Sequence, residues 1–111
     1  MTYEQVSGPA LIVEHTGQVF PLTGGVVTIG TEEDNTIVLA DPRVSSHHAR
    51  IFWEPDTGMY VVEDLGSVEG TFVNEIPVSG AQVLADSDLI RIGDTVMDVD
   101  LAGEVAPGPF R

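Results

Sequence analysis

Short β-branched stretches separated by turn signals are the feature that most constrains the fold of this chain. The stretches fall at 10–14, 18–22, 26–29, 37–39, 49–53, 59–63, 71–73, 82–84, 89–92 and 96–101. Turn signals recur about every 8–12 residues, a spacing typical of an all-β sandwich or barrel. No long segment keeps a helical period, since the best candidate, 81–92, is interrupted by Asp-Ser-Asp at 86–88. The sequence therefore predicts an all-β fold.

The last stretch shows how such strands are expected to lie. In 96–101, Asp98 and Asp100 alternate with apolar Met97, Val99 and Leu101. Successive side chains of a strand point to opposite faces, so one face is expected to pack on a core and the other to meet water.

The length of 111 residues fits one domain. A chain of this size buries about two-thirds of its unfolded surface, which is enough for one core. We expect an N-terminal extension at 1–8, the domain at 9–102, and a tail or linker rich in proline and glycine at 103–111. Cysteine is absent, which excludes disulfides, thiolate zinc sites and cysteine nucleophiles.

Neither a membrane span nor a secretion signal is indicated. The longest apolar runs, 10–13 and 59–62, are four residues long, against the roughly 20 that a spanning helix needs. The N-terminal Met-Thr-Tyr-Glu lacks the basic and apolar regions of a signal peptide. We therefore expect a cytoplasmic protein.

The chain is strongly acidic, with 18 Asp+Glu against 4 Lys+Arg and a net charge of −14. Such a surface repels nucleic-acid phosphates and anionic lipids, so neither nucleic acid nor membrane is an expected partner. Within 28–75, ten acidic residues stand against two arginines, a local net charge of −8. The expected partner is a protein or peptide, and a basic one suits this charge.

Separated motifs follow one another in a fixed order and spacing. They are Ile-Gly-Thr at 29–31, Asn-Thr-Ile-Val-Leu at 35–39, Asp-Pro-Arg-Val-Ser-Ser-His-His-Ala at 41–49, Asp-Leu-Gly-Ser-Val-Glu-Gly-Thr-Phe-Val-Asn at 64–74 and Asp-Leu-Ile-Arg-Ile-Gly at 88–93. Together they resemble the forkhead-associated (FHA) domain over about residues 9–101. The resemblance implies an eleven-stranded β-sandwich of the SMAD/FHA-like type, with binding loops at one end.

The resemblance also implies a signalling module that binds phosphothreonine peptides. In the family pattern an arginine and a serine hold the phosphate, a second arginine supports them, and an asparagine bonds the peptide backbone. The serine position is kept as Ser45. The two arginine positions hold Thr31 and Ser46, and the asparagine position holds Glu69. Thr71 is kept and belongs with these loops.

The positions that brace the loops in the family are all kept. They are Gly30, His48, Gly66 and Gly70. The chain thus combines the family's loop supports with altered phosphate-contact positions.

The altered positions bear on phosphate affinity. Phosphothreonine carries about −1.5 to −2 charges and prefers arginine forks. Each charge-assisted hydrogen bond contributes about 1.5–3 kcal/mol, so losing two is expected to cost about two to four decades of affinity. Glu69 adds a repelling carboxylate. Arg43, two residues before Ser45, is a cation that can turn toward the phosphate.

Three other chemistries match residue types without matching spacing. His47 and His48 are consecutive, so on a strand they point apart and are poorly placed to share a metal. Ser45, His48 and Asp64 are the residue types of a hydrolase triad, but the nucleophile-elbow pattern is missing. The acidic run at 86–88 lacks the glycine and distal glutamate of a calcium loop. We expect no metal, no cofactor and no enzymatic activity.

Three functions remain open. The first is an interaction module that binds a protein without phosphate, or with weakened phosphothreonine affinity. The second is a phosphothreonine-binding domain that uses Arg43, Ser45 and Ser46. The third is a structural or assembly domain of a larger protein.

Overall fold

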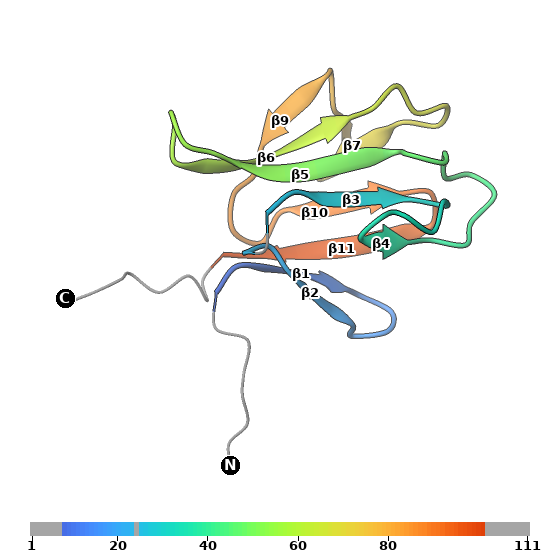
Figure 1. The fold of residues 1–111 in the computed structure, drawn as a ribbon, viewed down its shortest axis with the longest axis horizontal. Coiled ribbons are helices and arrows are strands. Elements are labelled where there is room, and N and C mark those ends of the chain that lie inside the picture. The colour runs from blue at the N-terminus through green and yellow to red at the C-terminus, as the bar shows by residue number, and fades with distance from the viewer. Residues whose placement is uncertain (1–7, 24, 102–111) are drawn as a thin grey trace, which may run out of the picture.

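The structure, a computed structural model, describes residues 8–23 and 25–101. Within these residues, eleven strands and no helix form two sheets (Figure 1). The larger sheet has the order β2 (Val19–Pro21), β1 (Ala10–Val13), β11 (Thr95–Asp100), β10 (Leu89–Ile92), β7 (Thr71–Val73) and β8 (Ile76–Pro77). The smaller sheet has the order β4 (Ile37–Val38), β3 (Val27–Gly30), β5 (Ala49–Glu54), β6 (Met59–Asp64) and β9 (Ala81–Val83). The predicted all-β sandwich is confirmed.

Each predicted stretch overlaps one strand, and β8 is the addition that the residue pattern does not predict. Its two residues, one of them proline, show no alternation. It pairs antiparallel with β7 through Phe72↔Pro77 and Val73↔Ile76. The extension predicted at 1–8 lies outside the described residues except for Gly8, and the tail predicted at 103–111 lies wholly outside them.

The strand directions bring three loops to one end of the sandwich. Because β5 is antiparallel to both β3 and β6, those two strands finish at the same end, and β4 runs parallel to β3. The loops 31–36, 39–48 and 65–70 therefore lie together, at the right-hand end in Figure 1. The β5–β6 hairpin lies at the opposite end.

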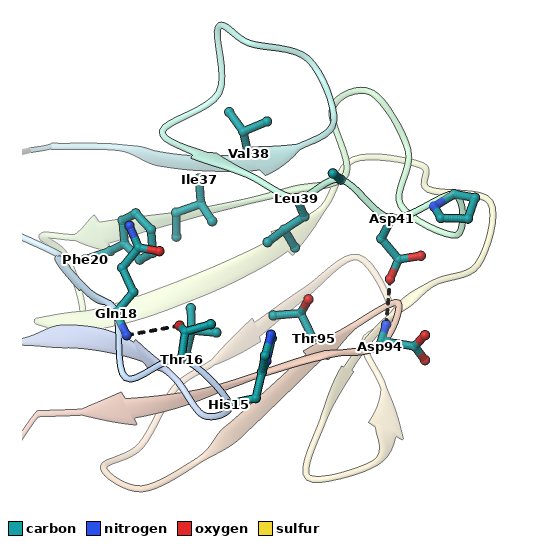
Figure 2. A pocket seen from close by; sticks show the side chains of 13 residues that line it. His15, Thr16, Gln18, Phe20, Ile37, Val38, Leu39, Asp41, Asp94 and Thr95 are labelled. Carbon is teal, nitrogen blue, oxygen red and sulfur yellow. Dashed lines mark hydrogen bonds between the residues drawn. The ribbon is translucent and has the colours of Figure 1, made fainter.

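The sheets part along one side of the molecule, where β2 and β4 are their edge strands. The gap forms a cavity of about 650 Å³ between the β1–β2 hairpin, the segment 37–42 and the β10–β11 turn (Figure 2). The cavity reaches the loop 39–48 at Pro42.

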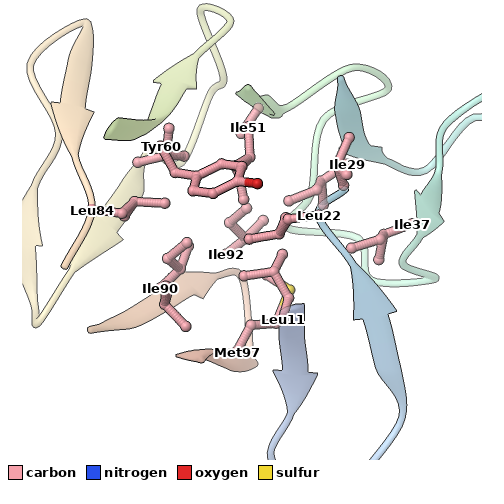
Figure 3. Packing of buried hydrophobic residues seen from close by; sticks show 14 of the residues in the cluster. Leu11, Leu22, Ile29, Ile37, Ile51, Tyr60, Leu84, Ile90, Ile92 and Met97 are labelled. Carbon is pink, nitrogen blue, oxygen red and sulfur yellow. The ribbon is translucent and has the colours of Figure 1, made fainter. Parts of the chain in front are cut away.

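The two sheets enclose one hydrophobic core (Figure 3). In β11, Met97 and Val99 are fully buried, whereas Asp98 and Asp100 lie half-buried on the outer face. This confirms the alternation predicted for 96–101. Burying a side chain of this size contributes about 1.5–3 kcal/mol, so the core fixes the strands that carry the loops.

Candidate functional site

The three loops enclose a shallow groove of about 590 Å³. Its lining residues are Thr31, Pro42, Arg43, Val44, Ser45, Ser46, His47, Val68 and Glu69. The structure thus brings together five of the residues that the sequence assigns to peptide binding. The sixth, Thr71, is 1% exposed and lies beneath the loops at the start of β7.

His48 joins two of the loops from below. Its side chain is fully buried. Nδ1 accepts a hydrogen bond from the backbone N–H of Ser45 at 3.0 Å, and Nε2 lies 2.9 Å from the carbonyl oxygen of Gly70. Because a backbone N–H must donate and a carbonyl must accept, the ring is the neutral tautomer with its proton on Nε2. The imidazole therefore fixes the spacing between the loops 39–48 and 65–70.

Asp64 organises the loop 65–70. Oδ1 accepts from Ser67 Oγ at 2.6 Å and from Thr71 Oγ1 at 2.7 Å, while Oδ2 accepts from the backbone N–H groups of Gly66 and Ser67 at 3.1 Å. Ser67 Oγ in turn accepts from the backbone N–H of Gly70 at 3.0 Å. Partial burial acts to raise the pKa of Asp64, but these hydrogen bonds outweigh it and hold the pKa below its ordinary value.

Two glycines give this loop its turns. Gly66 has φ 79° and Gly70 has φ 98°. Both values lie in the region that side chains with a Cβ rarely adopt. The carbonyl oxygen that accepts the hydrogen bond from His48 Nε2 belongs to Gly70, so the turn and the His48 contact depend on each other.

Gly30 and Asn35 hold the other two loops together. A Cβ at Gly30 would lie 2.1 Å from the carbonyl oxygen of Ser46, so only glycine fits. Asn35 Nδ2 donates to the carbonyl oxygens of Glu32 and Ser46, both at 2.8 Å, and the backbone N–H of Thr31 donates to Ser45 O at 3.1 Å. The loops 31–36 and 39–48 therefore meet through backbone atoms.

The Arg43 guanidinium forms an ion pair with Asp94 rather than contacting the serines of the groove. Its Nη2 donates to Asp94 Oδ1 at 2.7 Å, in the β10–β11 turn. The backbone N–H groups of Asp94 and Arg43 donate to the carboxylate of Asp41, and these bonds lower the pKa of Asp41. The chain's other described arginines, Arg50 and Arg91, are paired as well, with Glu63 and Glu75. Within 8–23 and 25–101, every arginine is therefore engaged by a carboxylate.

The groove is flanked by acid. Glu32, Glu33 and Glu69 are exposed. His47, which is also exposed, places Nε2 3.0 Å from Asp34 Oδ1. No group of three or more potential metal-ligating residues occurs in the described part of the chain.

Three supporting or presenting residues were not assigned to the site from sequence. Asn35 and Asp64 stand inside the motifs at 35–39 and 64–74, and the sequence indicates Asp64 only as a residue type of a hydrolase triad. Val68 also stands inside the motif at 64–74, at a position the family pattern leaves variable, and it is 90% exposed at the groove. Its backbone N–H donates to Ser45 Oγ at 3.1 Å, so the exposed valine stands on a fixed loop.

Among the described residues, no helix could span a membrane.

Residues 27–93 match the family model of the FHA domain. The FHA domain-containing protein FhaB of Mycolicibacterium smegmatis is 38% identical over 73 residues, which are 66% of this chain and 46% of that protein. The glycogen accumulation regulator GarA of the same organism is 40% identical over 91 residues, which are 78% of this chain and 56% of that protein. The chain thus spans about half the length of these curated relatives.

Solved structures give the same result. EmbR of Mycobacterium tuberculosis, in complex with a low affinity phosphopeptide, superposes with a TM-score of 0.81 at 33% identity. The match covers 94% of this chain and 27% of that one. A structure from work on phosphothreonine-dependent FHA domain interactions superposes with a TM-score of 0.76 at 33% identity, covering 85% of this chain and 96% of that one.

Proposed function

Because the chain belongs to the FHA domain family, whose members are protein-interaction modules, we propose that its three loops bind a protein partner without requiring phosphate. The observation that carries this proposal is the charge at the groove. The phosphate-contact positions hold Thr31, Ser46 and Glu69, and Arg43 is bonded to Asp94. No described arginine is left to neutralise a phosphate dianion.

The expected loss of phosphate-binding free energy also favours recognition without phosphate. Loss of two charge-assisted contacts costs about 3–6 kcal/mol, which turns a micromolar site into one of roughly millimolar affinity. Glu69 adds repulsion, because like charges about 6 Å apart at an effective dielectric of 20 cost on the order of 3 kcal/mol before screening.

The same groove suits a basic peptide. Exposed carboxylates at Glu32, Glu33 and Glu69 attract lysine and arginine, and complementary charge mainly raises association rate and specificity. Val68 supplies an apolar contact on a loop that needs no reordering on binding. We infer that the partner segment combines basic residues with an apolar one.

The test is a titration with matched peptide sets. Each set contains one sequence with threonine, phosphothreonine or glutamate at its centre, on basic, neutral and acidic backgrounds. We expect binding to follow the basic background and to ignore or decline with phosphorylation, measured by fluorescence anisotropy. Micromolar binding that disappears on dephosphorylation would overturn the proposal.

A second candidate retains phosphothreonine binding through Arg43, Ser45 and Ser46. The observation in its favour is that the Arg43 side chain is 51% exposed and lines the groove. An exposed ion pair contributes only about 0–1 kcal/mol, so a phosphate dianion can compete with Asp94 for the guanidinium. In this case Arg43→Ala abolishes phosphopeptide binding, whereas Arg50→Ala, outside the groove, leaves it unchanged. Equal binding by wild type and Arg43→Ala would remove this candidate.

A further inference from the structure

The cavity between β2 and β4 has the features of a second binding site. Figure 2 shows its residues, which come from the β1–β2 hairpin, the segment 37–42 and the β10–β11 turn. A volume of about 650 Å³ falls within the usual range of ligand pockets, about 300–1,000 Å³. Its apolar wall includes Phe20, Ile37 and Leu39.

One hydroxyl at this cavity has no hydrogen-bond partner among the described residues. Thr95 is 8% exposed, and no described residue forms a hydrogen bond with its hydroxyl. In Figure 2 that hydroxyl points across the cavity toward Leu39. The hydroxyl oxygen is accessible from the cavity, so a ligand group placed here can exchange hydrogen bonds with it in place of water.

The end of the cavity beside Thr95 is anionic. Asp41 and Asp94 line it; the guanidinium of Arg43 donates to Asp94, and the backbone N–H of Arg43 donates to Asp41. Two carboxylates against one guanidinium leave one negative charge unbalanced. An anionic ligand is therefore disfavoured, and a cation on an apolar stem fits both the wall and the end of the cavity.

The cavity also has a free backbone edge. The N–H of Leu39 donates to Gly30 O on β3 at 3.0 Å. Peptide groups alternate along a strand, so those of Val38 face away from β3 at the open edge of the smaller sheet. An extended peptide can pair with such an edge while one of its side chains enters the adjoining pocket.

From these features we infer that the cavity between β2 and β4 binds an extended peptide segment of a partner protein by accepting an arginine side chain. The stem packs on Phe20, Ile37 and Leu39. The guanidinium lies near Thr95 and Asp94. This site adjoins the loop groove, with which it shares Pro42, but the inference holds whether or not that groove requires phosphate.

The test uses three capped peptides, acetyl-Val-Arg-Val-amide and its citrulline and norleucine counterparts. Each is titrated into the full chain while backbone amides are followed by ¹H–¹⁵N NMR. We expect the arginine peptide to shift the amides of His15, Val38, Ala40 and Thr95, with a dissociation constant of roughly millimolar size. Citrulline keeps the shape without the charge, and is expected to bind about tenfold more weakly.

Two variants make the test specific. Thr95→Val removes the hydroxyl at nearly constant shape and is expected to weaken binding about 2–10-fold. Ala40 is exposed and lines the cavity, so Ala40→Leu should leave the packing of the core unchanged. The larger side chain is expected to block entry of the peptide. Met59→Ser, at an exposed position at the start of β6 and far from the cavity, is the control that leaves binding unchanged.

The titrations give different results depending on whether the cavity binds arginine. Shifts at the cavity that depend on arginine and are lost in Ala40→Leu support the inference. It is overturned if the cavity amides do not shift at about 10 mM peptide, if norleucine binds as tightly as arginine, or if the shifts are confined to Ser45, Val68 and Glu69.

Discussion

The braces beneath the loops and the side chains at the loop tips are built in opposite ways. His48 is buried and Asp64 is half-buried, and both are saturated with hydrogen bonds to the loops. By contrast, the side chains of Thr31, Ser46 and Glu69 form no hydrogen bond to any described residue. Loop shape and ligand contact therefore depend on separate atoms. A domain of this kind can therefore change what it binds without losing the shape that binds.

The largest expected effect comes from restoring the tips on intact braces. Thr31→Arg, Ser46→Arg and Glu69→Asn together should create phosphothreonine binding, with a gain of about two to four decades in affinity. Calorimetric titration with phosphorylated and unphosphorylated copies of one peptide measures this gain.

A matched control is Thr31→Ser, Ser46→Thr and Glu69→Gln, which changes the same positions without adding a cation. If the arginine variant stays folded but gains no phosphate-dependent affinity, the braces do not hold the loops in a competent shape, and the contrast between braces and tips fails.

The next effect is on stability and comes from breaking a brace. Asp64→Asn leaves one acceptor oxygen and sets an amide NH₂ against donors that are now unpaired. We expect the free energy of unfolding to fall by about 2–4 kcal/mol. Urea titration followed by Trp53 fluorescence measures it, and Asp56→Asn in the exposed β5–β6 turn is the control. A cost no larger than that of the control would show that Asp64 is dispensable.

The same carboxylate makes the brace sensitive to acid. Its folded-state pKa is lowered, so the stability it contributes is complete above the unfolded-state pKa and is lost as the pH falls through the folded-state pKa. We expect the free energy of unfolding to decline below about pH 4. The gap between wild type and Asp64→Asn should narrow from about pH 5 to pH 2.

Urea unfolding of both proteins across this pH range provides the measurement. Asp41 and Glu75 also have lowered pKa values, but they act equally in both proteins. A gap that stays constant with pH would mean that the charge on Asp64 is not what stabilises the loop.

The smallest expected effect lies at a tip. Val68→Ser changes a side chain that is 90% exposed and leaves the backbone bond to Ser45 Oγ in place. The free energy of unfolding should change by no more than about 0.5 kcal/mol. Urea titration tests this together with the NMR spectrum of the loop amides. A larger loss would place Val68 among the braces.

The sequence predicts the strands of this fold better than the hydrogen bonds and ion pairs of its site. Alternation of aspartate and apolar residues in 96–101 is a local signal, and β11 follows it. β8 leaves no comparable signal, because its two residues include a proline and form no β-branched stretch. The motifs indicate which residues meet at the loops, because those at 29–31, 35–39, 41–49 and 64–74 each contain residues of the loops 31–36, 39–48 or 65–70.

The state of Arg43 is beyond the reach of the sequence. Its partner Asp94 is 51 positions away along the chain. Whether that guanidinium faces the groove or the β10–β11 turn depends on how the two sheets are stacked, which no local pattern encodes. Likewise the Asp64 carboxylate is one acidic residue among 18 until its four donors are placed around it.

The Arg43–Asp94 ion pair has a consequence for how the two cavities communicate. Arg43 lines the loop groove and Asp94 lines the cavity beside β4, so one bond forms part of the wall of each. A cation that engages Asp94 on one side releases the guanidinium on the other. Thermodynamic linkage then requires the converse: an anion that draws Arg43 into the groove raises the affinity of the cavity for a cation by the same factor. If this pair opened in that way, ligands of opposite charge at the two sites would favour each other's binding.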